Sequence, residues 1–168
     1  VLTAKEDPEG NVTSYEYYGS GEAWPGLRKS VIRPIDTDLA YVTEYLAYDS
    51  QGNATEIQSF VRHLGASPSD DAADRHLVMT FDSLDRMTSA ADQLTGATTT
   101  IDYLVDGGTG AETVTITAPK INATDPSGPQ SVLVFDAEGK LSQVTDPLGR
   151  QISYAYDGNG LLQSATDQ

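Results

Sequence analysis

The side chains in this sequence that could do acid–base chemistry are mostly carboxylates. The 168 residues include 25 Asp and Glu against 10 Lys and Arg, giving a formal net charge of −15. Two carboxylates held roughly 5 to 10 Å apart can serve as an acid and a base. Here, however, the prominent Asp residues recur at fixed positions of an internal repeat, which favours a role in turns. We therefore expect no catalytic residue and no enzyme.

The other reactive groups show no pattern typical of a metal or cofactor site. His63 and His76 are not spaced as a metal pair, and the chain has no cysteine to act as a ligand or nucleophile. The segment 106–112 faintly resembles a calcium-binding nonapeptide, but it occurs once. Because successive copies of that motif share each ion, we expect a hairpin tip there instead. The sequence predicts neither a metal nor a cofactor.

Charge and hydropathy limit the partners. Nucleic-acid affinity comes mainly from Lys and Arg, so the net charge argues against a nucleic-acid partner. No apolar stretch approaches the roughly 18 to 20 residues that a membrane span requires, so we expect no membrane insertion. The candidate binding residue is Trp24, the one tryptophan, which could stack on a sugar or anchor a partner. A tryptophan in a loop more often covers a neighbouring core.

Three Asn-x-Thr sequons are present, at Asn11, Asn53 and Asn122. In a eukaryotic secreted chain they would be candidates for glycosylation. Asn and Thr are also favoured in turns and at strand starts, and in a bacterial protein we expect no modification.

Internal repetition is the clearest pattern in the chain. The motif Asp125-Pro126-Ser127-Gly128 recurs 21 residues later as Asp146-Pro147-Leu148-Gly149. Phe135-Asp136-Ala137-Glu138-Gly139 recurs at the same interval as Tyr156-Asp157-Gly158-Asn159-Gly160. This period accommodates two strands of about six to eight residues and two tight turns, which is a β-hairpin with its connection.

An aromatic anchor marks each copy of the repeat. The six anchors are Tyr17, Tyr48, Phe81, Tyr103, Phe135 and Tyr156. Four are followed by Asp and, three residues later, by a turn residue: Asp49 and Gly52, Asp82 and Asp85, Asp136 and Gly139, Asp157 and Gly160. We interpret residues 1–168 as a single run of about six copies, with longer hairpins or loops near 19–25, 63–74 and 107–120.

The repeated residue types have physical reasons. Residues two apart on a strand share a face, so stacked copies would place an aromatic stripe along one face of a sheet. The motif Asp can accept bonds from N–H groups of its own turn, while Gly supplies a positive φ. In the other turn, Asp146-Pro147-x-Gly149, Pro presets φ and Gly permits the reversal. The expected fold is all-β, of tandem antiparallel hairpins stacked into a curved sheet or β-spiral shell, with at most one helical turn over 69–75.

These motifs resemble the RHS/YD-repeat family, whose copies read approximately YDxxGxLxxxxDPxGR, and residues 125–167 match best. The resemblance implies a non-catalytic segment of a secreted or cell-surface bacterial protein, forming part of a β-shell that encloses or presents a toxin or other domain. The implied partners are neighbouring repeats of the same or a longer chain, and a C-terminal toxin domain or a surface glycan.

The same resemblance bears on self-cleavage. The family's aspartyl self-cleavage site has an apolar residue after the glycine of Asp-Pro-x-Gly. Here Gly128 is followed by Pro129 and Gly149 by Arg150, so no catalytic residue is carried over.

The alternative function is an extracellular binding module. Its outer sheet face or inserted loops would recognise carbohydrate or a cell-surface partner. Each repeat depends on its neighbours for burial. With either function we therefore expect exposed edges at both ends of the sheet, to which further strands would pair.

Overall fold

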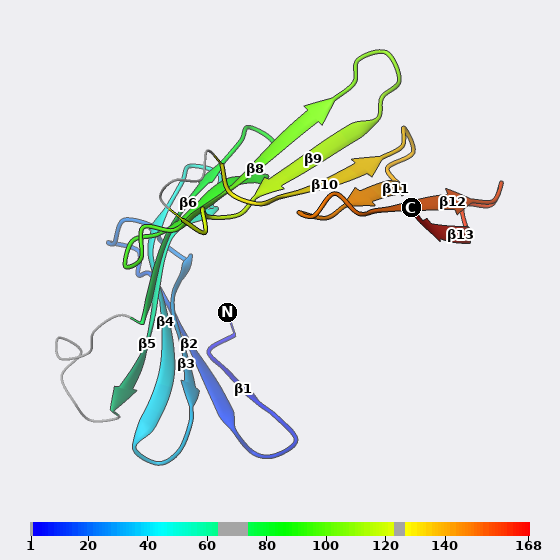
Figure 1. The fold of residues 1–168 in the computed structure, drawn as a ribbon. Coiled ribbons are helices and arrows are strands. Elements are labelled where there is room, and N and C mark those ends of the chain that lie inside the picture. The colour runs from blue at the N-terminus through cyan, green and yellow to red at the C-terminus, as the bar shows by residue number, and fades with distance from the viewer. Residues whose placement is uncertain (1, 64–73, 123–126) are drawn as a thin grey trace. The chain divides into compact units, whose positions relative to one another are not determined.

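The structure, a computed structural model, describes residues 2–63, 74–122 and 127–168, and their regular structure is entirely β-strand (Figure 1). Among these residues no helix is long and apolar enough to cross a membrane. The helical turn expected over 69–75 lies mostly outside the described residues, and Arg75 already belongs to a strand.

The chain divides into two compact units, Val1–Gly96 and Ala97–Gln168. In the described residues the first unit holds β1 (Ala4–Glu6), β2 (Val12–Tyr17), β3 (Arg28–Pro34), β4 (Leu39–Tyr48), β5 (Ala54–His63), β6 (Arg75–Phe81) and β7 (Met87–Asp92). The second holds β8 (Thr98–Val105), β9 (Glu112–Thr117), β10 (Gln130–Phe135), β11 (Leu141–Thr145), β12 (Gln151–Tyr156) and β13 (Leu162–Asp167).

Strand order follows chain order, and within each unit every strand pairs antiparallel with the next. The expected all-β fold of antiparallel hairpins is confirmed. This topology needs only short connections, because consecutive antiparallel strands can be joined by a tight turn.

The first unit contains the buried apolar side chains of the described chain, and they lie in its central strands. Ala40, Val42 and Phe60 are at most 3% exposed and form one cluster, with Ile32 packed against it. Val42 pairs with Ile32 on one side and with Phe60 on the other. These side chains therefore share one face of β3, β4 and β5, where β4 and β5 are ten residues each and form the longest hairpin.

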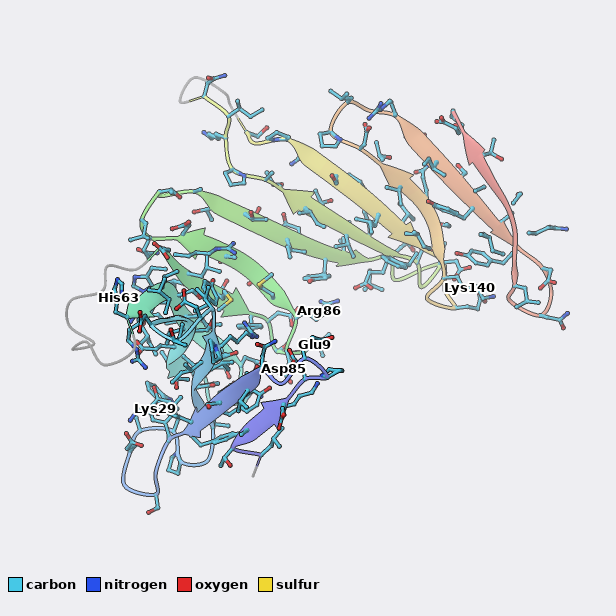
Figure 2. All side chains as sticks on the ribbon, turned by 90° about the horizontal axis from the view of Figure 1, so that it is seen from below. Glu9, Lys29, His63, Asp85, Arg86 and Lys140 are labelled. Atoms are coloured by element: carbon cyan, nitrogen blue, oxygen red, sulfur yellow. The ribbon has the colours of Figure 1, made fainter. Side chains whose placement is uncertain are left out.

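The second unit is a single layer of strands with side chains on both faces (Figure 2). One apolar row crosses it through cross-strand partners, from Tyr103 to Val114, Leu133, Val144 and Ile152. These five side chains are at least partly exposed. Apolar and polar residues thus alternate along the strands, but the described part of this unit has no second layer that would bury the apolar face.

The aromatic anchors occupy equivalent places in the hairpins. Five of them are the last residues of β2, β4, β6, β10 and β12, and the sixth, Tyr103, lies near the end of β8. Each anchor therefore belongs to an even-numbered strand, so one copy corresponds to two strands. The division into six copies stays a prediction.

The segments expected to be enlarged differ in what they contain. Residues 19–25 belong to the β2–β3 connection, and 107–120 comprise most of the β8–β9 turn together with β9. Of 63–74, the structure describes only the two ends, His63 in β5 and Asp74 beside β6.

Candidate functional site

The same five-residue turn recurs six times among the described connections. In each, one oxygen of an Asp accepts bonds of 2.8 to 3.1 Å from the N–H groups two and four residues later. The Asp carbonyl accepts a further bond from the N–H three residues later. The six residues are Asp7, Asp49, Asp82, Asp136, Asp146 and Asp157.

The third residue after the Asp always has a positive φ. Glycine occupies this place in five turns, at Gly10, Gly52, Gly139, Gly149 and Gly160, and Asp85 occupies it in the sixth with φ 60°. The tyrosine–aspartate motif and the Asp-Pro-x-Gly motif, interpreted above as two kinds of turn, therefore form the same one. Pro147 is the second residue of its turn, and the missed turn, Asp7-Pro8-Glu9-Gly10, carries the same sequence signal.

In four of these turns, the side chain of the fifth residue donates a hydrogen bond to the other oxygen of the Asp carboxylate. The donors are Asn11, Asn53, Arg86 and Arg150, at 2.6 to 3.0 Å from the oxygen. Two of the sequon asparagines, Asn11 and Asn53, thus have a structural role in closing hairpins. Both oxygens of these carboxylates are engaged within their own turn.

Hydrogen bonding keeps these carboxylates ionised. The side-chain bond from Arg150 lowers the pKa of Asp146, and the bond from Asn11 lowers the pKa of Asp7. For Asp49 and Asp82 burial acts to raise the pKa, but hydrogen bonds from their turns outweigh it and the pKa is lowered. A carboxylate held in this way is suited to closing a turn and poorly suited to transferring protons near neutral pH.

The β8–β9 hairpin closes differently. The residue after its anchor is Leu104 and not Asp. The turn is closed instead by Asp106, whose carboxylate accepts hydrogen bonds from the N–H groups of Gly108 and Thr109 at 2.8 Å. These backbone bonds lower the pKa of Asp106. The segment that resembles a calcium nonapeptide is therefore a hairpin turn, and no group of three or more potential metal ligands occurs among the described residues.

Three tyrosine anchors make the same hydrogen bond. The hydroxyls of Tyr17, Tyr48 and Tyr156 donate to the carbonyl oxygens of Leu2, Arg28 and Leu141, at 2.7, 2.6 and 2.9 Å. Each acceptor lies at or just before the start of the preceding strand. Burial, followed by the nearby Tyr45, raises the pKa of Tyr48 to about 12, so its hydroxyl remains a donor at physiological pH.

Trp24 belongs to an aromatic cluster at the β2–β3 connection. Its ring meets Tyr18 edge-on, with centroids 5.4 Å apart, and is tilted against Tyr48 at 6.0 Å. The indole is half-buried. These contacts attach the connection to the end of β4, and the binding role for Trp24 stays a prediction.

The two histidines lie apart from each other in the first unit. His76 in β6 has its Nε2 2.8 Å from Glu56 Oε1, and His63 is the last residue of β5. Gln58, not His63, is the cross-strand partner of His76. Their positions at a strand start and a strand end agree with a structural role.

These features define a tandem β-hairpin repeat protein whose hairpins are closed by aspartate turns and fastened by tyrosine hydroxyls. Residues 135–167 match the family described as RHS Repeat. The match extends from the end of β10 through β13, and over these residues the resemblance drawn from the sequence is confirmed. A comparison with curated proteins gave no match.

The fold is also similar to crystal structures of TcdB2-TccC3, TcdB2-TccC3-Cdc42 and TcdB2-TccC3-TEV, with TM-scores of 0.55, 0.54 and 0.53. Sequence identities are 15%, 14% and 14%, so the likeness shows the fold alone. The similarity covers 95%, 98% and 98% of this chain but 9%, 10% and 10% of those chains. The chain thus spans about a tenth of their length, and family and fold together support a structural RHS-repeat segment.

Proposed function

We propose that the chain is a length of β-sheet wall that encloses or presents another domain, and that it has no catalytic activity of its own. The observation that carries this proposal is the second unit, a single layer whose apolar row is partly exposed. A free-standing domain buries such a face against a second layer. A wall can leave that face to a neighbouring part of a larger assembly.

The open edges of the sheet support the same proposal. Among the described strands β1 and β13 each pair on one side only. All six side chains of β13 are exposed. An unpaired edge is a template for a further strand, and a repeat array gains stability from each neighbour that it adds. The proposed partners are therefore adjacent repeats of the same or a longer chain.

The RHS repeat and the likeness to TcdB2-TccC3 support a proposal for the cargo and the location. A C-terminal toxin domain is the proposed occupant, in a secreted or cell-surface bacterial protein. The absence of catalysis is supported by the turn carboxylates, since Asp7, Asp49, Asp82 and Asp146 each have both oxygens engaged within their own turns.

Protease protection tests enclosure. In a longer chain that joins this segment to neighbouring repeats and a C-terminal domain, a cleavage site engineered into that domain should be cut slowly while the repeats are folded. The same domain expressed alone serves as the control and should be cut rapidly. Equal cleavage rates in the two proteins would refute enclosure.

The alternative, a binding module for carbohydrate or a cell surface, predicts saturable binding in a glycan screen of the isolated chain. Loss of binding on Trp24→Ala would place the site at the β2–β3 connection. A wall without a recognition role should bind no glycan, and unchanged binding in the variant would remove Trp24 as the candidate.

A further inference from the structure

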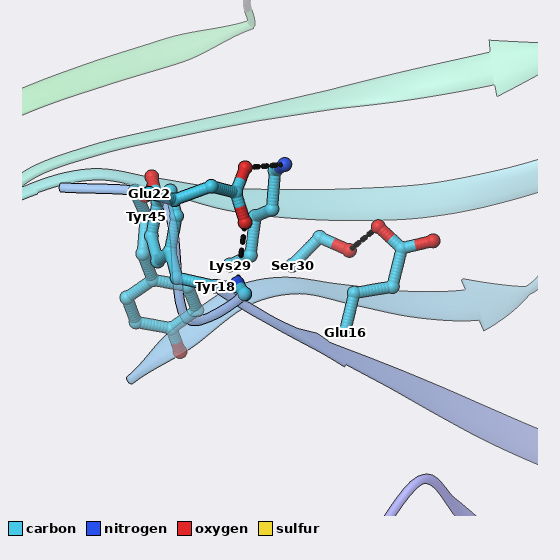
Figure 3. Close-up of polar contacts among 7 residues, drawn as sticks. Glu16, Tyr18, Glu22, Lys29, Ser30 and Tyr45 are labelled. Carbon is cyan, nitrogen blue, oxygen red and sulfur yellow. Dashed lines mark hydrogen bonds and ion pairs between the residues drawn. The ribbon is translucent and has the colours of Figure 1, made fainter. Parts of the chain in front are cut away.

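A small pocket in the first unit lies apart from the turns and is lined from three strands. Its volume is about 150 Å³, and its walls include Glu44 of β4. The walls also include Glu16 of β2, Lys29 and Ser30 of β3, and Tyr18 at the start of the β2–β3 connection, which Figure 3 shows. Pockets for drug-sized ligands measure roughly 300 to 1,000 Å³. This one has room for a small head group.

Strand register brings the polar walls together. Ser30 is the direct cross-strand partner of Glu16 on one side and of Glu44 on the other. The three side chains therefore stand in a row on one face. Neighbouring strands are about 4.8 Å apart, which places the two glutamate backbones roughly 10 Å apart across the serine. Their carboxylates can approach one ligand from both sides.

The connection beside the pocket is held in place. Glu22 accepts from the Gly19 N–H with one oxygen and from Lys29 Nζ, at 2.6 Å, with the other (Figure 3). The Lys29 ammonium also lies 5.4 Å from the centroid of the Tyr18 ring. The Tyr18 hydroxyl donates to the Tyr45 carbonyl at 2.6 Å. These contacts position Tyr18 and Lys29 beside the pocket, while Glu16 stands exposed at its edge.

The polar atoms of the pocket that remain free to bind a ligand are mainly hydrogen-bond acceptors. Ser30 Oγ, in a residue 4% exposed, donates to Glu16 Oε2 at 2.9 Å, and Gln58 Nε2 donates to Glu44 Oε2 at 2.7 Å. Within the described part of the chain, the second oxygen of each glutamate accepts no hydrogen bond. Lys29 is paired with Glu22 and also attracts Glu16 at longer range. One ammonium therefore faces the three carboxylates of Glu16, Glu22 and Glu44, which leaves the pocket with a surplus of negative charge. Carboxylates with free lone pairs select a ligand that donates and carries positive charge.

We propose that this pocket binds a small organic cation, through a primary ammonium or guanidinium head group held between Glu16 and Glu44. The Tyr18 ring forms the side wall, against which the alkyl part of the ligand packs. The head group is either that of a free amine or that of a Lys or Arg side chain on a partner polypeptide. This site is independent of the wall function proposed above.

The probe is agmatine, which carries both head groups, titrated into the intact chain and followed by calorimetry and by Trp24 fluorescence. We expect saturable binding that weakens as salt is added. The double variant Glu16→Gln, Glu44→Gln keeps the size and the acceptors for Ser30 and Gln58, and should weaken binding more than tenfold. Glu138→Gln, an exposed carboxylate of the second unit, is the matched control and should bind as the parent does.

Two further probes separate the sources of the cation. An end-blocked arginine peptide that binds as tightly as agmatine identifies the side chain of a partner, whereas binding of agmatine alone identifies a free amine. Methyl glucoside, a neutral probe, should not bind. The proposal is overturned if agmatine shows no saturable binding, if the double variant binds it unchanged while circular dichroism reports an intact fold, or if methyl glucoside binds in its place.

Discussion

The hydroxyl of Tyr156 donates a 2.9 Å hydrogen bond to the carbonyl oxygen of Leu141, fifteen residues earlier. Tyr156 is the last residue of β12 and Leu141 the first of β11, so the bond fastens one hairpin to the strand before it. Tyr17 reaches Leu2 over the same sequence separation. The aromatic anchor of the repeat therefore contributes a specific polar contact as well as an apolar ring.

Removing this hydroxyl should destabilise the second unit. Tyr156→Phe keeps the ring but leaves the Leu141 carbonyl without its donor, and we expect the free energy of unfolding to fall by about 1 kcal/mol. Urea denaturation measures this change. Tyr154→Phe, on the same face of the same strand, is the control, because the Tyr154 hydroxyl makes no hydrogen bond within the described part of the chain. Equal losses in the two variants would show that the hydroxyl bond is not the cause.

The turn aspartates predict a loss of stability in acid. The pKa values of Asp7, Asp49, Asp82, Asp106 and Asp146 are lowered in the folded chain. A lowered folded pKa contributes stability that is present above the unfolded value, about 3.9, and is lost as pH falls through the folded value. Urea denaturation at a series of pH values should therefore show stability constant near neutrality and decreasing below about pH 4.

The net charge of −15 acts in the opposite direction, because protonation relieves repulsion among carboxylates. Raised salt screens that repulsion and leaves the short hydrogen bonds of the turns largely intact. The decrease in acid should then be clearer at high salt. Asp146→Asn, which keeps an acceptor but removes the charge facing Arg150, should flatten the pH dependence. A variant with the full dependence would argue against the turn aspartates as its source.

The aspartate turns could be predicted from the sequence because the whole interaction lies within five consecutive residues. In the last turn, Asp157 and Gly160 are enough to predict the structure. The Asp carboxylate can accept from the N–H groups two and four residues later, and the glycine is free to adopt the positive φ that the turn needs. Sequence reasoning nevertheless separated the Asp-Pro-x-Gly motif as a second turn type. Proline at the second position changes the preference for the turn and leaves its hydrogen bonds as they are.

Other contacts could not be predicted because they depend on strand register. The acceptor of Tyr156 lies in another strand, and the row of Glu16, Ser30 and Glu44 exists only because β2, β3 and β4 pair in one alignment. A β-bulge at the start of β3, where Lys29 is the extra residue between the partners of Glu16 and Tyr17, interrupts the regular pairing beside that row. Nothing in the sequence around Trp24 shows that Tyr48 would be its neighbour.

Asp85 is the one non-glycine residue with positive φ among the described residues. A side chain in this left-handed region costs about 1 kcal/mol relative to glycine, although Asp tolerates it better than most. The compensating contact is one exposed bond, from Asn53 Nδ2 to Asp85 Oδ1 at 3.0 Å. We expect Asp85→Gly to stabilise the first unit by about 0.5 kcal/mol, measured by urea denaturation. The reverse change at the equivalent place, Gly139→Asp, should destabilise the second unit, and a gain there would contradict this explanation.

Gly128 is required for a close approach of two backbone segments rather than for its φ. A Cβ at this position would overlap the carbonyl oxygen of Ala118 and lie 2.8 Å from its carbonyl carbon. The same approach carries a 2.9 Å bond from the Ala118 N–H to the Pro129 carbonyl, at the connection of β9 to β10. Backbone atoms cannot move aside as a flexible side chain can, so Gly128→Ala must displace one segment.

The expected cost of Gly128→Ala is about 2 kcal/mol of unfolding free energy, typical of overpacking in a close contact. Hydrogen exchange at the Ala118 amide should also become faster, because the displaced segment no longer offers the Pro129 carbonyl. Gly158→Ala is the matched control, since a Cβ there meets nothing within 4 Å. The free energy of unfolding of that variant should lie within about 0.5 kcal/mol of the value for the parent. If the two alanines had the same effect, the approach of Gly128 to Ala118 would not be what requires glycine at this position.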